Sequence, residues 1–284
     1  MDTLIKIDFT KSIREIKKLL GRPLIAAHRG VCGANIPCNT LAAYKIAINQ
    51  GAEVVEIDVS KSKDGKYFVF HPGMEPEFIR CGKYLSDMTA EEIQNIRLLN
   101  SDGVLTHYTI PTLSEVFALL KDKVYINVDK FWTDIPGITA EIRKAGVENQ
   151  VIVKTYADEK SWDEVERYAP DLQYMTMAWH KDDVTKRLEG RNIRYIGIEA
   201  LFDKESDEIA SDSYIRAMHE KGLLVWMNAI VYNEKEVISA GHTDDISLTS
   251  DPTLGWGWLS RKKADFIQTD WLVLLKRYLE TNRA

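Results

Sequence analysis

Two histidines and a pair of carboxylates follow or interrupt short apolar runs between residues 24 and 72. His28 follows the run LIAA, His71 ends the run YFVF, and Glu56 and Asp58 alternate with apolar residues in VVEIDV. Polar groups that close apolar runs usually lie at strand ends, where binding and catalytic residues concentrate on a rigid scaffold. We therefore expect these side chains to form one site at the mouth of a sheet.

The carboxylates predict a metal site. Glu56 and Asp58 are two residues apart on a predicted strand, so both side chains point to the same side. Two carboxylates that converge in a partly buried site repel each other unless a proton or a cation lies between them. Asp129 ends the next core strand, in YINVDK, and in a parallel barrel it projects from the same rim. The all-oxygen set suits Ca²⁺ or Mg²⁺, whereas an isolated E-x-D pair is more often a solvated strand edge.

The two histidines predict proton transfer. A single histidine at a strand end is more often a structural group than a catalyst, but two on one rim beside a metal could flank a scissile bond as general acid and base. Arg29 follows His28 directly, and its planar guanidinium matches the oxygens of a phosphate. The residue types together favour chemistry on a phosphate ester.

Composition and charge exclude other classes. The chain has 284 residues, 45% of them hydrophobic, and a formal net charge of -6. Its Lys and Arg residues are scattered, so we expect no nucleic-acid partner and no polybasic membrane patch. The N-terminus has no unbroken apolar segment and no run reaches spanning length, which predicts a cytoplasmic protein without stable membrane insertion. The sequence leaves the oligomeric state open.

The cysteines are expected to be reduced. Cys32, Cys38 and Cys81 are odd in number and lack CxxC spacing, which argues against a disulfide framework and against a zinc site. No partner arrangement suggests a thiol nucleophile.

The elements that must position the site follow a βα rhythm. With Tyr67–His71 set aside as an added strand after the turn KDGK, the pattern gives about eight βα units, as in a TIM (β/α)8 barrel formed by residues 1–284 as one domain. An open doubly wound sheet is disfavoured because HRGVCGAN has too few glycines for its fingerprint. The predicted strands are Leu24–Ala27, Val54–Asp58, Val124–Asp129, Val151–Thr155, Tyr174–Ala178, Tyr195–Glu199, Leu223–Asn228 and Asp265–Gln268.

Two segments depart from this rhythm. Before the first strand, Thr10 is a plausible N-cap of a helix that ends at Gly21 and could plug the bottom of the barrel. After the second strand, residues 72–107 form a small insertion with one helical patch after Thr89 and no strong strand.

The order of these motifs resembles the glycerophosphodiester phosphodiesterase family. HRG, P-x-N-T, GAEVVEIDV, DG, a histidine, IPTLSEV, a strand ending in an acid and a late Thr269-Asp270 follow one another over nearly the whole chain. The resemblance implies a TIM barrel with an insertion after its second strand, and metal-dependent hydrolysis of a small-molecule glycerophosphodiester such as glycerophosphocholine. By position, it implies the metal ligands Glu56, Asp58 and Asp129, the acid-base pair His28 and His71, and the phosphate contact Arg29.

Three positions depart from the family pattern. Cys38 stands where the family usually has Glu, Pro72 follows His71 where Asp is common, and Phe131 stands where a Lys is frequent. Strand alternation predicts that Lys130 points away from the site, so Lys154 is our candidate for the missing cation at the phosphate.

One aromatic position and two alternatives remain. Trp226 falls where the family often has a tryptophan near the substrate, although an aromatic in a barrel strand is more often packing. The alternatives are a barrel that binds glycerophosphodiesters with weakened turnover, and a phospholipase acting on lysophospholipids, which an apolar rim around the site would favour.

Overall fold

Eight parallel strands form a closed barrel. The computed structural model describes residues 7–231 and 235–282. A nine-stranded sheet runs in the order β1-β11-β10-β9-β8-β7-β6-β2-β3, and β1 also pairs with β2, which closes the ring and leaves β3 outside it. The barrel strands are β1 Leu24–Ala27, β2 Val54–Lys61, β6 Tyr125–Asp129, β7 Val151–Tyr156, β8 Gln173–Trp179, β9 Tyr195–Leu201, β10 Leu224–Asn228 and β11 Phe266–Thr269. The predicted TIM barrel is confirmed.

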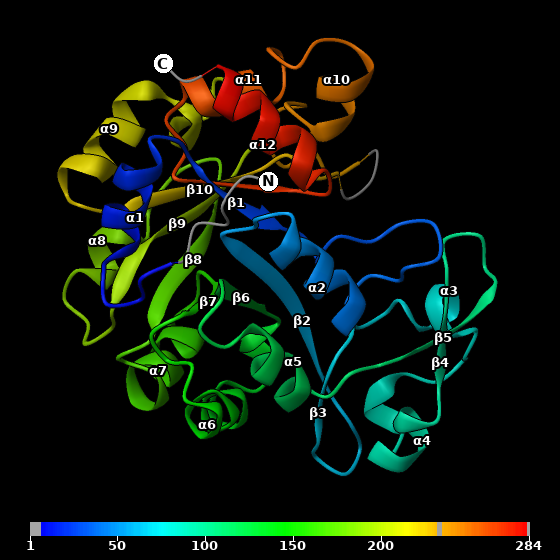
Figure 1. Ribbon diagram of the computed structural model, residues 1–284. Helices are drawn as coiled ribbons and strands as arrows, with labels where there is room; N and C mark the ends of the chain where they lie inside the picture. Colours follow the sequence, from blue (N-terminus) through cyan, green and yellow to red (C-terminus); the bar gives the residue numbers. More distant parts are fainter. Residues whose placement is uncertain (1–6, 232–234, 283–284) are drawn as a thin grey trace.

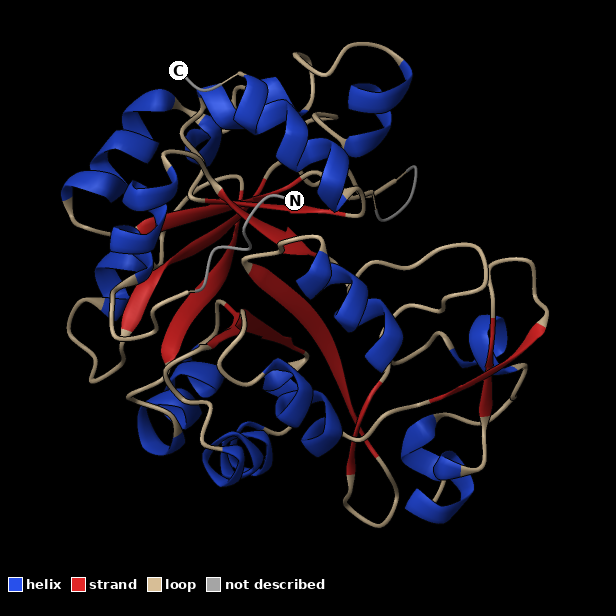
Figure 2. Ribbon diagram, in the orientation of Figure 1, coloured by secondary structure: helices blue, strands red, loops and turns tan. Residues whose placement is uncertain are grey.

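Helices cover the outside of this barrel (Figure 2). Many begin at a residue whose side chain caps the first turn; Thr112, for example, forms a capping box with Glu115 at the start of α5. The surrounding helices are α2 Leu41–Asn49, α5 Leu113–Leu120, α6 Ile135–Ala145, α7 Glu159–Tyr168, α8 Thr185–Leu188, α9 Asp212–Glu220, α10 Asp244–Thr249, α11 Trp256–Arg261 and α12 Leu272–Thr281. Within the described ranges, every helix falls short of the length and apolar content needed to cross a membrane.

The first helix, α1 Ile13–Leu20, covers the bottom of the barrel as predicted. Its apolar side chains join one buried cluster with inward-facing residues at the starts of strands, among them Leu24 and Phe266. The predicted N-cap was wrong. Ser12 caps the helix through a capping box with Glu15, and the hydroxyl of Thr10 bonds to Asp8 instead.

The predicted added strand and insertion are both present between β2 and α5. The turn after Lys61 leads into β3 Tyr67–Val69, which pairs antiparallel with β2. The segment that follows has its own small core and lies beside the barrel (Figure 1). It contains α3 Glu75–Ile79, a 3-10 turn Leu85–Asp87, α4 Ala90–Gln94 after the predicted cap Thr89, β4 Arg97–Leu99 and β5 Leu105–Thr109.

The expectation that this insertion lacks a strong strand was wrong in one respect. The segments β4 and β5 pair as an antiparallel ribbon, which extends slightly beyond the predicted boundary at His107. Both strands are short, and β5 is mostly exposed, so neither carries the apolar run by which the barrel strands were found. A buried bond from Thr106 Oγ1 to the carbonyl of Leu98 links them.

Candidate active site

The predicted site residues meet at the carboxyl ends of β1, β2 and β6. His28 and Arg29 follow β1, Glu56 and Asp58 lie on β2, and Asp129 is the last residue of β6. This face is where TIM barrels carry their active sites. A cavity of about 70 Å³ opens there. Its lining includes His28, Arg29, Glu56, His71, Asn127, Asp129, Lys130, Trp132, Lys154, Tyr156, Met177, Glu199, Leu201 and Gln268.

The three acids form a compact oxygen cluster. One carboxylate oxygen each from Glu56, Asp58 and Asp129 lie within 4.8 Å of one another. The parallel register of β2 and β6 explains this, because it sets Glu56 beside Asn127 and Asp58 beside Asp129. Sequence reasoning missed Asn127, although N-x-D on one strand repeats the spacing of E-x-D on its neighbour.

Burial and nearby charges shift the pKa values of the two carboxylates of β2 in opposite directions. Burial raises the pKa of Glu56 well above its usual value, and the charges of Asp58 and Asp129 raise it further. Burial also acts to raise the pKa of Asp58, but the cations Arg29 and Lys130 and the hydrogen bond from Asn39 act in the opposite direction, and that pKa is lowered. The cluster therefore favours a proton or a cation beside Glu56.

The cluster meets the requirements of a hard divalent cation. Two buried oxygens at this place, Asp58 Oδ1 and Asn127 Oδ1, have no hydrogen-bond partner among the described residues. Buried acceptors without a donor are destabilising, and an ion with oxygen ligands satisfies them. The residues present thus fit Ca²⁺ or Mg²⁺, and nothing in the donor set chooses between the two.

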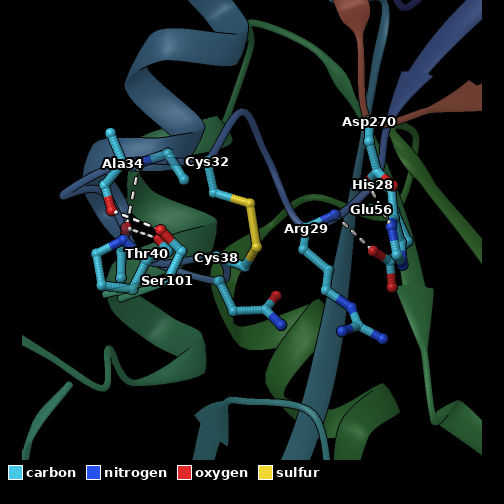
Figure 3. Close-up of a disulfide and its surroundings, with 12 residues drawn as sticks. His28, Arg29, Cys32, Ala34, Cys38, Thr40, Glu56, Ser101 and Asp270 are labelled. Carbon is cyan, nitrogen blue, oxygen red and sulfur yellow. Dashed lines mark hydrogen bonds and ion pairs between the residues drawn. A yellow bond between two sulfur atoms is a disulfide. The ribbon is translucent and has the colours of Figure 1, made fainter. Parts of the chain in front are cut away.

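His28 is oriented by an acid from the last barrel strand. Its Nδ1 atom lies 2.8 Å from Asp270 Oδ1, and Figure 3 shows the two side chains together beside Glu56. From the sequence, Thr269-Asp270 was noted only as one motif of the family resemblance. Thr269 does anchor the segment, because its hydroxyl donates to Asp244 Oδ1 at 2.7 Å. The carboxylate of Asp270, however, belongs to the site.

His71 lies beside the acidic cluster. Its Nε2 atom lies 3.9 Å from Asp58 Oδ1. Burial lowers the pKa of His71, and Arg29 and Lys130 lower it further against the opposing effect of Asp58. The imidazole is therefore held in its neutral form, which is able to accept a proton.

Arg29 contacts both acids of β2. Its Nε atom lies 3.0 Å from Asp58 Oδ2, and its backbone N–H donates to Glu56 Oε2 at 2.8 Å. Gly30 follows, at φ +83°, where an added Cβ would lie 2.8 Å from the backbone of Ala43 in α2. Only glycine lets α2 pack this close to the turn that carries the arginine.

The prediction for Lys130 was wrong. Its Nζ atom lies 2.8 Å from Asp129 Oδ2 and 3.9 Å from Asp58 Oδ1, so the side chain faces the site. The strand ends at Asp129, and Lys130 adopts a left-handed conformation with φ +62°, which breaks the alternation that the prediction assumed. Phe131, in contrast, is fully buried in the core between the barrel and its helices.

Lys154 lines the cavity but is already paired. Its Nζ atom lies 3.0 Å from Glu199 Oε2 and 3.4 Å from the ring centre of Trp226. Burial lowers its pKa, although Glu199 acts in the opposite direction. Glu199, which sequence reasoning missed, sits like Asp129 near the end of a barrel strand. Its other oxygen accepts a bond from Asn228 at 2.7 Å.

Trp226 lies beneath the cavity. It is 0% exposed, belongs to the cluster at the bottom of the barrel, and is not part of the cavity lining. Its Nε1–H donates to Asn228 Oδ1 at 3.0 Å. Trp226 thus packs against Lys154 outside the lining of the cavity, and its contact with substrate stays a prediction.

The cysteine prediction was wrong for two of the three residues. Cys32 and Cys38 form a disulfide in the loop between Arg29 and α2 (Figure 3), whereas Cys81 is free. Asn39, directly after the disulfide, donates from Nδ2 to Asp58 Oδ2 at 2.8 Å. Cys38, at the position where the family usually has a glutamate, thus closes this loop through the disulfide. The next residue, Asn39, contacts the acidic cluster.

Comparisons with known proteins point to one family of enzymes. The profile of the glycerophosphoryl diester phosphodiesterase family matches residues 28–228. A glycerophosphodiester phosphodiesterase of Caldanaerobacter subterraneus is 33% identical over 160 residues, which cover 54% of this chain and 65% of that protein. One of Bacillus altitudinis is 29% identical over 146 residues, 46% of this chain and 57% of that protein. The chain thus spans less than two thirds of these curated relatives.

Solved structures share the fold. A glycerophosphoryl diester phosphodiesterase from Parabacteroides distasonis superposes with a TM-score of 0.74 at 19% identity, over 95% of this chain and 92% of that one. A phosphodiesterase from Oleispira antarctica, solved with the product sn-glycerol-3-phosphate, gives 0.67 at 16% identity, over 95% and 100%. Since the family profile covers most of the chain, including both strands of the acidic cluster, the chain belongs to the glycerophosphoryl diester phosphodiesterase family.

Proposed function

We propose that this chain hydrolyses glycerophosphodiesters to an alcohol and glycerol 3-phosphate, with a divalent cation and two histidines. One observation carries the proposal. His28, His71 and Arg29 line a single cavity together with Glu56 and Asp129 of the acidic cluster, at the active-site face of the barrel. Family membership supports the substrate class.

The acids and cations would share the work of holding the phosphodiester. Glu56, Asp58 and Asp129 would hold the cation, which supplies positive charge to the phosphoryl oxygens as charge develops on them. Arg29 would contact the same oxygens while it braces Asp58. Lys130 adds a second positive side chain on this rim, in the role for which the sequence had suggested Lys154.

The histidines would move the protons. With Nδ1–H of His28 donating to Asp270, its Nε2 atom faces the reaction as the proton-transferring nitrogen. His71, held neutral by its surroundings, would work as its partner. One of them would deprotonate the attacking water, or the substrate's own hydroxyl on a route through a cyclic phosphate, and the other would protonate the leaving alcohol.

A headgroup-release assay tests this proposal. Glycerophosphocholine and glycerophosphoethanolamine would each be assayed with Ca²⁺, with Mg²⁺ and with a chelator. We expect turnover with one or both ions and none with the chelator. His28→Ala and His71→Ala should each lower kcat by about 100-fold or more while the protein stays folded. Retained turnover in either variant would contradict the acid-base pair.

The metal ligands need a matched control. His180, Asp203 and Asp207 form a second acidic group, largely exposed, whose ligand atoms are equally close together. Asp58→Asn should abolish the rise in thermal stability that the activating ion gives, whereas Asp207→Asn should preserve it. If Asp207→Asn alone removed the stabilisation by the ion, the ion would bind at His180, Asp203 and Asp207, and the proposed ligands would be wrong.

Lysophospholipids belong in the same assay because one wall of the cavity is aromatic. Trp132 and Tyr156 pack with ring centres 4.7 Å apart, and Tyr156 is 53% exposed. Such a rim could accept the glycerol-acyl part of a lysolipid. Release of headgroup from lysolipids alone would favour the phospholipase alternative, and no turnover with any substrate would favour a binding barrel.

A further inference from the structure

We propose that a cavity at the opposite end of the barrel binds a small soluble phosphate monoester with an apolar body. The cavity has a volume of about 490 Å³. It is lined by residues that precede or begin β1, β10 and β11, and by residues of α1, α9, α11 and α12. The proposed catalytic groups lie at the other ends of the barrel strands, so the two cavities are separate.

The lining is strongly cationic although the chain as a whole is acidic, with a formal net charge of -6. Among the described residues of the lining, Asp265 is the only acid, and its charge is already satisfied. It pairs with Lys17, lies 2.9 Å from His219 Nε2 and accepts the backbone N–H of Val225 at 2.7 Å. The cationic lining residues are Arg14, Lys17, Lys18, Arg22 and Lys263.

Several of these cations have no acidic partner in the part of the chain that the structure describes. Within residues 7–231 and 235–282, Arg14, Lys18 and Lys263 make no ion pair, and they reach the cavity from α1 and from the loop before β11. Like charges gathered around one cavity repel one another, and an anion in their midst relieves that repulsion. The field inside the cavity therefore favours a ligand of negative charge.

A buried arginine adds to this positive charge. Arg22 is 5% exposed, and its Nη atoms bind Glu53 and the carbonyl of Pro23. Its Nε–H has no hydrogen-bond partner among the described residues. This nitrogen is shielded from solvent, so Arg22 contributes positive charge to the wall of the cavity and not a free donor to a ligand.

The rest of the lining limits the ligand's chemistry. Pro23, Leu224 and Leu279 are buried apolar residues of the wall. The volume lies within the range of pockets for small organic ligands, which combine an apolar wall with a few charged groups. Phosphate suits the arginines, since the guanidinium group matches its oxygens. A phosphate monoester on an apolar or aromatic body fits both parts of the cavity.

Calorimetric titration with AMP, inorganic phosphate and adenosine tests the proposal, with a chelator present throughout. The cavity variant is Arg14→Ala/Lys18→Ala/Lys263→Ala, and its control, Lys83→Ala/Lys160→Ala/Lys186→Ala, removes the same charge from exposed positions elsewhere. We expect AMP to bind the wild type and the control alike, and adenosine to bind far more weakly. The cavity variant should lose about tenfold in affinity for each cation removed.

A second variant separates this cavity from the catalytic one. Arg29→Ala should keep its affinity for AMP, and the cavity variant should keep its turnover of glycerophosphodiesters. The proposal is overturned if AMP does not bind the wild type, if adenosine binds as tightly as AMP, or if the cavity variant and its control bind AMP equally. Binding to vesicles of phosphatidylcholine and phosphatidic acid, without binding of AMP, would overturn the assignment to a small soluble ligand.

Discussion

His28 and Asp270 lie at opposite ends of the sequence, yet His28 Nδ1 is 2.8 Å from Asp270 Oδ1. Closure of the barrel brings them together, because β1 pairs with β11 and the register sets Ala27 beside Thr269. Each of the two residues is the first after its strand. A carboxylate at Nδ1 fixes the tautomer and the orientation of the imidazole.

Asp270→Asn should therefore lower kcat by about 10 to 100-fold with little change in KM. The amide can keep a contact with Nδ1, but it can also donate to that nitrogen, so it no longer fixes the tautomer of His28. Steady-state kinetics would measure the loss. Asp245→Asn, at an exposed acid, should leave kcat and KM unchanged. In a His28→Ala background, Asp270→Asn should have no further effect, and additive losses would contradict the coupling.

Lys130 and Lys154 should differ in what their removal affects. Lys130→Ala should weaken kcat/KM by about tenfold or more with little change in stability, since its side chain is partly exposed at the cavity. Lys154→Ala should lower the free energy of unfolding by about 3 to 5 kcal/mol, because it leaves the buried carboxylate of Glu199 without its cation. Urea unfolding and kinetics on both variants would separate the roles. If the Lys154→Ala protein is stable but has no turnover, then Lys154 is the cation that contacts the phosphate.

The two lysines also show where sequence reasoning reached its limit. The E-x-D pair, the strand-end acid and the histidines were found because each interrupts or closes an apolar run that forms a barrel strand. Lys130 was misplaced because alternation holds only inside a strand, and its left-handed conformation at φ +62° ends the strand one residue earlier. Asn127 and Glu199 were missed because the role of each depends on residues of a neighbouring strand, and the sequence does not show which strands are neighbours.

The disulfide was missed for a related reason. An odd number of cysteines argues against a framework of disulfides, but one pair needs only a loop that brings two Cα atoms close, here to 5.0 Å. That loop is set by Gly33 and Ile36, which exchange two backbone bonds at 3.0 Å. Neither the spacing nor the count of cysteines carries this information.

Replacing both Cys32 and Cys38 by serine should lower the free energy of unfolding by about 2 kcal/mol, the amount expected when so short a loop loses its closure. It should also weaken binding of the activating ion, because Asn39 then holds Asp58 less firmly. Denaturant unfolding and metal titration would measure the two effects. Cys81→Ser is the control and should change neither. Unchanged ion affinity in the double variant would show that Asn39 keeps its position without the disulfide.

Asp244 should make stability depend on pH in a narrow window. It accepts bonds from Trp256 Nε1 at 2.6 Å, from Thr269 Oγ1 at 2.7 Å and from the backbone N–H of Asp270 at 2.9 Å. Burial raises the pKa of Asp244 from 3.8 to about 6, even though these donors act in the opposite direction. Between the two values, the folded chain holds a proton that the unfolded chain has released.

The free energy of unfolding should therefore fall as the pH rises through this window. Above about pH 6, the ionisation of buried Asp244 should have lowered it by about 3 kcal/mol in all. Asp244→Asn loses the bond from Asp270 N–H but cannot titrate, so the difference between wild type and variant should shrink as the pH rises from about 4 to about 6. Urea unfolding at intervals across this range would measure it. Parallel curves for the two proteins would mean that the folded state holds Asp244 ionised, with its three donors outweighing its burial.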